Sequence, residues 1–152
     1  MKFSDLEIAI LKEIQRDTSV SLADIAEAVG AGQSTVWRKL ADMDAAGVIK
    51  RRVAILDPMK TGLGLCIFAT VSLRDHSEAS VNAFARIVRS HPEVQECHAI
   101  TGSADYMVKI RVADVAAYER FMTYHLLRSD VVQSVHSSFS LKQLKDTTEL
   151  PL

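Results

Sequence analysis

The chain has 152 residues, of which 48% are hydrophobic and 24% are charged, and its formal net charge is −1. This composition is ordinary for a folded globular protein and argues against disorder over most of the chain. No apolar run approaches the roughly 20 residues that cross a bilayer, and acidic residues interrupt the first ten positions. The sequence therefore predicts neither a membrane span nor a signal peptide, and we expect a cytoplasmic protein with one domain or two small ones.

The first third of the chain has the hydrophobic spacing of helices with one buried face. Apolar residues recur every three or four positions, which predicts helices over residues 5–16, 21–29 and 33–46. Ser4 or Asp5 can cap the first helix. Gly30 and Gly47 favour the ends of the second and third, because glycine adopts the left-handed conformation that often terminates a helix.

A basic and apolar run, Val48–Leu56, follows the third helix and predicts a short β-hairpin or wing. Three helices and a wing are typical of a winged helix-turn-helix, in which the third helix enters the major groove of DNA. Local positive charge can bind phosphates even on a nearly neutral protein. The expected DNA-binding residues are Ser34, Thr35, Trp37 and Arg38 as base readers, with Lys39, Lys50, Arg51 and Arg52 on the backbone phosphates. The alternative is a small helical bundle with a polar face, in which Trp37 belongs to the core.

Asp57-Pro58 and the glycines Gly62 and Gly64 interrupt all periodicity and mark the expected domain boundary. The pattern beyond them alternates between strands and helices. It predicts strands over 65–73, 94–101, 106–112 and 131–144, and helices over 77–90 and 114–128. The residues of the helix over 114–128 that are expected to face inward are Val115, Tyr118, Phe121, Met122 and Leu126. The order β-α-β-β-α-β is the ferredoxin-like arrangement.

The sequence offers little for metal or catalytic chemistry. Cys66 and Cys97 lie in apolar runs and are expected to be reduced, buried thiols. The five histidines are scattered without the spacing of a zinc site. No catalytic triad, phosphate-binding loop or dinucleotide fingerprint is recognisable, so we expect neither a cofactor nor an enzyme.

Several collinear stretches resemble the Lrp/AsnC family, also called feast/famine regulators, over essentially the whole chain. The stretches that carry the resemblance are Asp5–Leu11, Ser21–Ala26, Gln33–Leu40, Gly47–Ile49, Ala54–Pro58, Pro92–His98, Thr101–Tyr106 and the region from Ser137 to Leu152. The resemblance implies a transcriptional regulator that binds double-stranded DNA. It also implies a second domain that pairs two chains into a dimer, assembles dimers into tetramers or octamers, and binds an amino-acid effector between dimers.

The resemblance further implies an effector site at the loop from Gly102 to Asp105. The expected effector-binding residues are Thr101, Gly102, Asp105, Tyr106, Ser137 and Ser138. Backbone N–H groups of such a turn can hold a carboxylate, and Asp105 can pair with an α-ammonium group. The alternative is that Gly102 makes the turn and Asp105 merely caps it.

Two positions depart from the family pattern. Gly32-Gln33 stands where many members have Ser-Pro, which leaves operator preference open, and Val135 lacks the hydroxyl that many members carry there. Two other functions stay open: a tetrapyrrole decarboxylase using His98 and His136, as some chains resembling this family are, or a sensing module with a vestigial DNA-binding half.

Taken together, the sequence predicts an α+β protein. An N-terminal winged helix-turn-helix, residues 1–60, precedes a ferredoxin-like βαββαβ effector and oligomerisation domain, residues 61–152.

Overall fold

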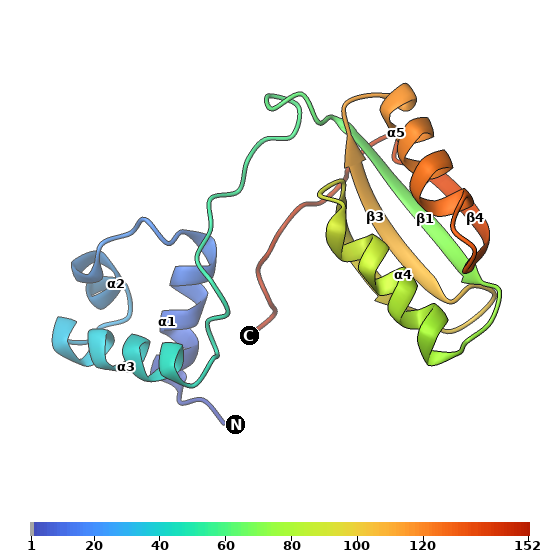
Figure 1. The fold of residues 1–152 in the computed structure, drawn as a ribbon. Helices are drawn as coiled ribbons and strands as arrows, with labels where there is room; N and C mark the ends of the chain where they lie inside the picture. Colours follow the sequence, from blue (N-terminus) through green and yellow to red (C-terminus); the bar gives the residue numbers. More distant parts are fainter. Residues whose placement is uncertain (1) are drawn as a thin grey trace. The chain divides into compact units, whose positions relative to one another are not determined.

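The computed structural model describes residues 2–152 (Figure 1). The chain divides into two compact units. The N-terminal unit comprises Met1–Ile55 together with Leu144–Leu152, and the sheet unit comprises Leu56–Gln143. Within the part of the chain that is described, no helix is long and apolar enough to cross a membrane.

Three helices form the N-terminal unit, as the spacing predicts. They are α1 (Asp5–Arg16), α2 (Leu22–Ala28) and α3 (Gln33–Ala45). Ser4 caps α1 in a reciprocal capping box with Glu7, which satisfies two backbone N–H groups at the helix start. Gly30 and Gly47 take φ values of 65° and 70°, in the left-handed region. The helices pack around a core of Ile10, Leu11, Ile14, Ile25, Ala26, Val36 and Met43.

The β-hairpin predicted at 48–56 is wrong in this structure, because residues 46–64 contain no strand. The physical reason is visible in the run itself. It has no glycine, proline, asparagine or aspartate between Val48 and Leu56, so nothing in it favours the tight turn that a two-stranded hairpin requires. The run is instead a single extended segment with exposed Val53, Ile55 and Leu56.

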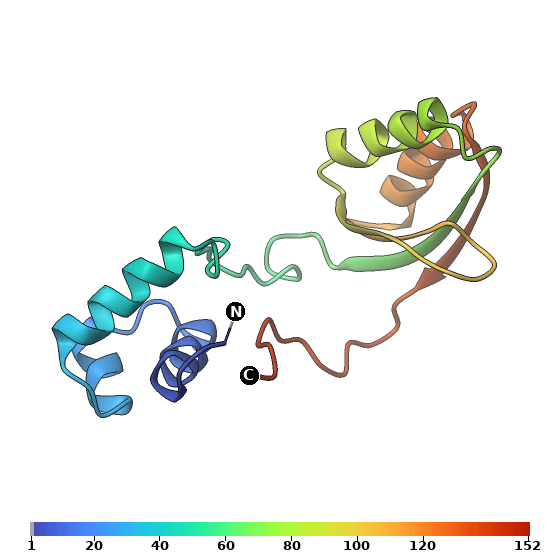
Figure 2. The ribbon, with the colours of Figure 1, turned by 90° about the horizontal axis from the view of Figure 1, so that it is seen from below.

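The sheet unit has the predicted βαββαβ order. Its elements are β1 (Leu65–Leu73), α4 (Glu78–Ser90), β2 (Val94–Ala99), β3 (Tyr106–Val112), α5 (Val115–Phe121), the π-helical turn η1 (Met122–Leu127) and β4 (Val132–Phe139). The strands form one antiparallel sheet in the order β2-β3-β1-β4. The helices α4 and α5 cover the same face of the sheet (Figures 1 and 2).

Alternation along the strands separates a buried face from an open one. In β1, Ile67, Ala69 and Val71 are fully buried toward the helices, whereas Phe68 between them is 41% exposed. The buried face and the helices share one core, made of Ile67, Ala69, Val71, Leu73, Phe84, Val108, Ile110, Val112, Tyr118, Phe121, Leu126 and Val132. Within the sheet unit, the described helices all lie on the other face of the sheet, so none of them covers the open face (Figure 2).

The last strand ends at Phe139, not at the predicted residue 144. Phe139 pairs with Ile67 and the Ser140 N–H donates to the Cys66 carbonyl, so the pairing of β4 stops just inside the start of β1 at Leu65. Leu141, although it continues the alternation, is 98% exposed. A strand needs a neighbour to satisfy its backbone groups, and the alternation of β4 alone cannot show where the neighbour ends.

Two expectations about buried side chains also need correction. Val115 was expected to face inward but is 59% exposed. It directly follows the N-cap residue Asp114, before the helix turns its apolar side toward the sheet. Cys66 and Cys97 are free but only half-buried, and burial raises the pKa of the Cys97 thiol.

Candidate functional site

One face of α3 is free of the core and carries three of the predicted base readers. Ser34, Trp37 and Arg38 are exposed and lie three and four positions apart, which places them on one side of the helix. Val36, on the other side, is fully buried. Trp37 is 64% exposed and is not part of the core, so the interpretation of Trp37 as a buried residue is wrong. Thr35 is half-buried at the edge of this face.

Lys39 does not share that orientation. Its Nζ lies 3.0 Å from Oε1 of Glu7 in α1, in a partly buried ion pair. The other carboxylate oxygen of Glu7 accepts hydrogen bonds from the backbone N–H and hydroxyl of Ser4. The hydrogen bond from the Ser4 N–H lowers the pKa of Glu7 most, the hydrogen bond from Lys39 comes second, and the resulting pKa is about 2. Lys39 therefore joins α3 to α1.

The basic cluster after α3 is also divided. Nη2 of Arg52 lies 2.8 Å from Oδ2 of Asp44, which ties the extended segment back to α3. Lys50 and Arg51 are exposed and take part in none of the ion pairs found among residues 2–152. Of the cations predicted to contact DNA, Arg38, Lys50 and Arg51 are thus the exposed ones that take part in none of the ion pairs found between the described residues.

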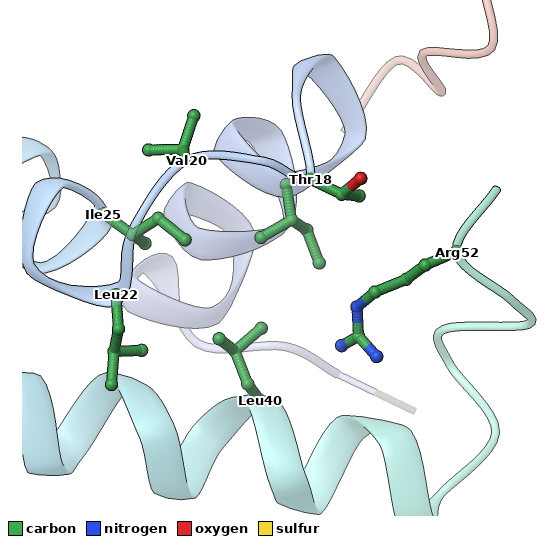
Figure 3. Close-up of a pocket in the computed structure, with 7 residues that line it drawn as sticks. Thr18, Val20, Leu22, Ile25, Leu40 and Arg52 are labelled. Carbon is green, nitrogen blue, oxygen red and sulfur yellow. The ribbon is translucent and has the colours of Figure 1, made fainter. Parts of the chain in front are cut away.

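Arg52 also lines a shallow hollow of about 180 Å³ in the N-terminal unit (Figure 3). Its other lining residues are mostly aliphatic: Ile14, Thr18, Val20, Leu22, Ile25 and Leu40. The guanidinium group lies across from Leu40 and Thr18 in Figure 3. Because this group is already paired with Asp44, the hollow offers an incoming anion no free charge.

In the sheet unit, Asp105 holds the predicted effector loop against the end of β1. Its carboxylate accepts a hydrogen bond from the Leu73 N–H at 2.8 Å, and its backbone N–H donates to the Val71 carbonyl at 3.0 Å. The Asp105 carbonyl in turn accepts from the Ile100 N–H at 2.9 Å, closing the loop. This is the capping role that the sequence left open as an alternative.

The second carboxylate oxygen of Asp105 lies 2.8 Å from Nε2 of His76, a residue that the sequence did not single out. His76 lowers the pKa of Asp105, with a further contribution from the Leu73 N–H. Asp105 reciprocally raises the pKa of His76. The two residues are far apart in the chain, so no local motif could have identified the pair.

The remaining effector candidates lie in different environments. Thr101 and Gly102 are exposed, and Gly102 has a φ of 119°, which strongly favours glycine. Tyr106 packs into the sheet unit with its ring centroid 4.7 Å from that of Phe84. Of the candidates, Thr101, Gly102, Asp105 and Tyr106 therefore form one contiguous loop and strand start.

Ser137 and Ser138 point to opposite faces of β4. Ser137 pairs with the buried Ala69 and shares a short hydrogen bond with the hydroxyl of Tyr118 under the helices. Ser138 pairs with Phe68 and is exposed. A ligand on one face of the sheet cannot contact both hydroxyl groups.

The other histidines do not assemble into a metal site. Nε2 of His98 lies 3.5 Å from Glu96, which is also bound by Lys109 at 2.7 Å. The rings of His91 and His125 lie with their centroids 4.0 Å apart and are tilted by 48° relative to each other. Within residues 2–152, no group of three or more histidine, cysteine or acidic side chains is arranged to hold a metal ion.

Comparison with protein families divides the chain in the same order as the fold. Residues 3–50 match a winged helix-turn-helix DNA-binding family. Residues 66–150 match the Lrp/AsnC ligand binding domain.

Individual relatives match over nearly their whole length. The chain is 38% identical to the glutamate uptake regulatory protein of Zymomonas mobilis over 152 residues, covering 99% of this chain and 92% of that protein. It is 35% identical to the DNA-binding transcriptional activator DecR of Escherichia coli, covering 94% of each chain. These relatives are named as regulators and not as enzymes.

Solved structures agree with this fold. A transcriptional regulator from Neisseria meningitidis, crystallised in complex with L-methionine, aligns with a TM-score of 0.95 at 34% identity, covering 99% of this chain and 97% of that one. An AsnC family transcriptional regulator from Agrobacterium tumefaciens aligns with a TM-score of 0.93 at 35% identity, covering 98% and 97%.

Proposed function

The chain belongs to the Lrp/AsnC family of DNA-binding transcriptional regulators, and from this premise we propose which residues contact DNA, effector and partner. Residues 1–60 bind operator DNA, and residues 61–152 bind the effector and a second copy of the chain. The observation that carries the proposal is the exposed face of α3 formed by Ser34, Trp37 and Arg38. We propose that this regulator works in the cytoplasm.

In the proposed DNA complex, α3 enters the major groove. Arg38 forks onto a base edge, and Ser34 and Thr35 donate to bases or phosphates. Trp37 adds an apolar contact beside them. The phosphate contacts come from Lys50 and Arg51, which extend into solvent on the segment after α3.

Lys39 and Arg52 act differently in this proposal. Their ion pairs with Glu7 and Asp44 fix α3 and the following segment in place. They contribute to the local positive field and to the shape of the DNA-binding face, but they do not need to touch a phosphate.

For the effector we propose an amino acid bound at the loop from Thr101 to Asp105. The name of the glutamate uptake relative and the L-methionine complex of the structural relative support this class of ligand. Exposed loop N–H groups around Gly102 suit the effector carboxylate. Asp105 is already engaged with Leu73 and His76, so its proposed role is to fix the conformation of the loop that the ligand contacts. In this proposal Tyr106 and Ser137 act from the face of the sheet that the helices cover, and Ser138 lies on the open face.

The open face of the sheet supports assembly with a second copy of the chain. Phe68 and Met107 expose 41% and 40% of their surface there, on adjacent strands. The Glu96–Lys109 ion pair borders them. An apolar centre surrounded by a polar rim is typical of homodimer interfaces. We propose a dimer through this face and further association of dimers into tetramers or octamers.

The DNA-binding half is tested by fluorescence anisotropy with a duplex from the region upstream of the chain's own coding sequence. The wild type should bind it tightly relative to a scrambled duplex, and Arg38→Ala should lower the affinity for the upstream duplex by about 5- to 150-fold. Lys12→Ala, an exposed cation of α1, is the matched control. Equal affinity of wild type and Arg38→Ala for the upstream duplex would remove Arg38 from the reading face.

The effector half is tested by thermal shift of the purified protein with each of the twenty amino acids. A ligand at about 100 times its dissociation constant stabilises the bound protein by roughly 2.7 kcal/mol, a measurable rise in Tm. We expect a single class of amino acid to give this rise. A uniform absence of shifts would contradict an amino-acid effector and leave DNA binding untouched.

A further inference from the structure

The segment Leu144–Leu152, called here the tail segment, is part of the N-terminal unit although it follows the sheet unit in the chain. One side chain of α1 makes the main contact. Gln15 accepts the Leu150 N–H through Oε1 at 2.9 Å and donates through Nε2 to the Leu150 carbonyl at 3.1 Å. The carboxamide therefore binds both backbone groups of one residue, as a neighbouring strand does.

A second contact joins the residue after Gln15 in α1 to the residue before Leu150 in the tail segment. Nε of Arg16 lies 3.6 Å from Oε2 of Glu149. The tail segment also has local structure, because the Glu149 N–H donates to Oγ1 of Thr147 and the Leu152 N–H donates to the Leu150 carbonyl. The backbone groups around Leu150 are thus arranged for Gln15.

We infer that the C-terminal end of α1 is a docking site for the tail segment. Gln15 recognises an extended backbone, and Arg16 favours an acidic side chain immediately before the bound residue. The occupant is residues Glu149 and Leu150 of the same chain. The tail segment thereby forms a second connection between the sheet and the DNA-binding helices, in addition to the segment after α3.

The contact is suited to reversible use. It consists of hydrogen bonds exposed to solvent and an ion pair between exposed side chains, each of which contributes little in water. Residues 140–143 join the tail segment to β4, which carries Ser137. If the proposed function holds, DNA bound to the N-terminal unit, of which the docked tail segment is a part, alters docking on α1, and docking alters DNA binding by the same factor.

Docking itself is tested without DNA or effector, by hydrogen exchange of the Leu150 amide in the full-length protein. We expect protection in the wild type, roughly tenfold faster exchange in Gln15→Ala, and wild-type exchange in Lys12→Ala on the same helix. Gln15→Glu, which keeps an acceptor but loses the donor, should fall between them. Unprotected exchange in the wild type, or equal exchange in wild type and Gln15→Ala, would overturn the docking site.

Coupling is tested by repeating the exchange measurement with the upstream duplex bound at saturation. We expect at least a threefold change in Leu150 exchange on DNA binding in the wild type and none in Gln15→Ala. An unchanged rate in the wild type would overturn the coupling. Failure of the duplex to bind at all would instead count against the proposed function, so the two failures are distinguishable.

Discussion

Lys39 forms an ion pair with Glu7, with Nζ and Oε1 3.0 Å apart, while its neighbour Arg38 extends into solvent. Two adjacent cations of α3 thus serve different purposes: one joins two helices and the other is free for a ligand. The dipeptide Arg38-Lys39 alone could not indicate these different roles, because the partner of Lys39, Glu7, lies in a different helix.

Substituting these two neighbours should separate DNA recognition from folding. Arg38→Ala should weaken DNA binding by about 1–3 kcal/mol with little change in stability. Lys39→Ala should lower the free energy of unfolding by up to about 1 kcal/mol, because partly exposed ion pairs contribute modestly. Its DNA affinity should fall by less than that of Arg38→Ala. Urea unfolding and anisotropy on the same preparations measure both quantities, and a larger affinity loss for Lys39→Ala would reverse the assignment.

Glu7 should give the protein a specific sensitivity to acid. Its pKa is lowered from 4.5 to about 2, so the stabilisation is complete above pH 4.5 and is lost as the pH falls through about 2. Glu7→Gln removes this titration. Its Tm should therefore depend less steeply on pH between 4.5 and 2 than that of the wild type. Asp5→Asn, in the same helix turn, is the control, because it removes a carboxylate and leaves the contacts of Glu7 with Ser4 and Lys39 in place. Parallel Tm curves for wild type and Glu7→Gln would disprove the role of Glu7.

The His76–Asp105 pair should stabilise the effector loop over a defined pH window. The pKa of His76 is raised from 6.5, so its contribution is complete below pH 6.5 and is lost as the pH rises through the raised value. The pKa of Asp105 is lowered from 3.8, so its contribution is present above pH 3.8 and is lost below it. In His76→Ala, exchange of the loop amides at 101–105 should quicken at pH 5.5 and change little at pH 8.5. His98→Ala is the control, and equal acceleration at both pH values would exclude protonated His76 as the cause.

Tyr118 and Ser137 should behave as one interacting unit. Their hydroxyl groups share a hydrogen bond beneath the helices, and burial raises the pKa of the Tyr118 phenol. Tyr118→Phe should lower the free energy of unfolding by about 1 kcal/mol. The double variant Tyr118→Phe/Ser137→Ala should lose less than the sum of the single variants, because no hydroxyl is then left unpaired. Strict additivity in urea unfolding would mean that the two groups do not interact.

The helices and the strand order could be predicted because they depend on local patterns. The apolar spacing of α1 and α3, and the alternation in β1 and β3, each repeat within a few residues. The failures depend on distant partners. The end of β4 depends on its last backbone contacts with β1, at Ile67 and Cys66, and the alternation through Leu141 could not indicate it.

In the candidate site, too, local patterns could be predicted and contacts between distant residues could not. The exposed face of α3 followed from periodicity, so Ser34, Trp37 and Arg38 were placed together correctly. The engagement of Asp105 by His76, and of Lys39 by Glu7, joins residues from separate elements. The opposite orientation of Ser137 and Ser138 was implicit in strand alternation, although the resemblance to the family grouped them.

The π-helical turn Met122–Leu127 has a consequence for how the chain tolerates changes in length. A π turn contains one residue more per hydrogen-bonded ring than an α turn. Deleting one residue within it can therefore leave a continuous helix between Phe121 and Arg128. In a regular α-helix the loss of one residue would rotate one flank about the helix axis by roughly 100° relative to the other. The bulge absorbs this step, so after such a deletion the flanking residues, among them Phe121 in the core, can keep their neighbours. The turn thus fixes the rotational phase between the two ends of this helix.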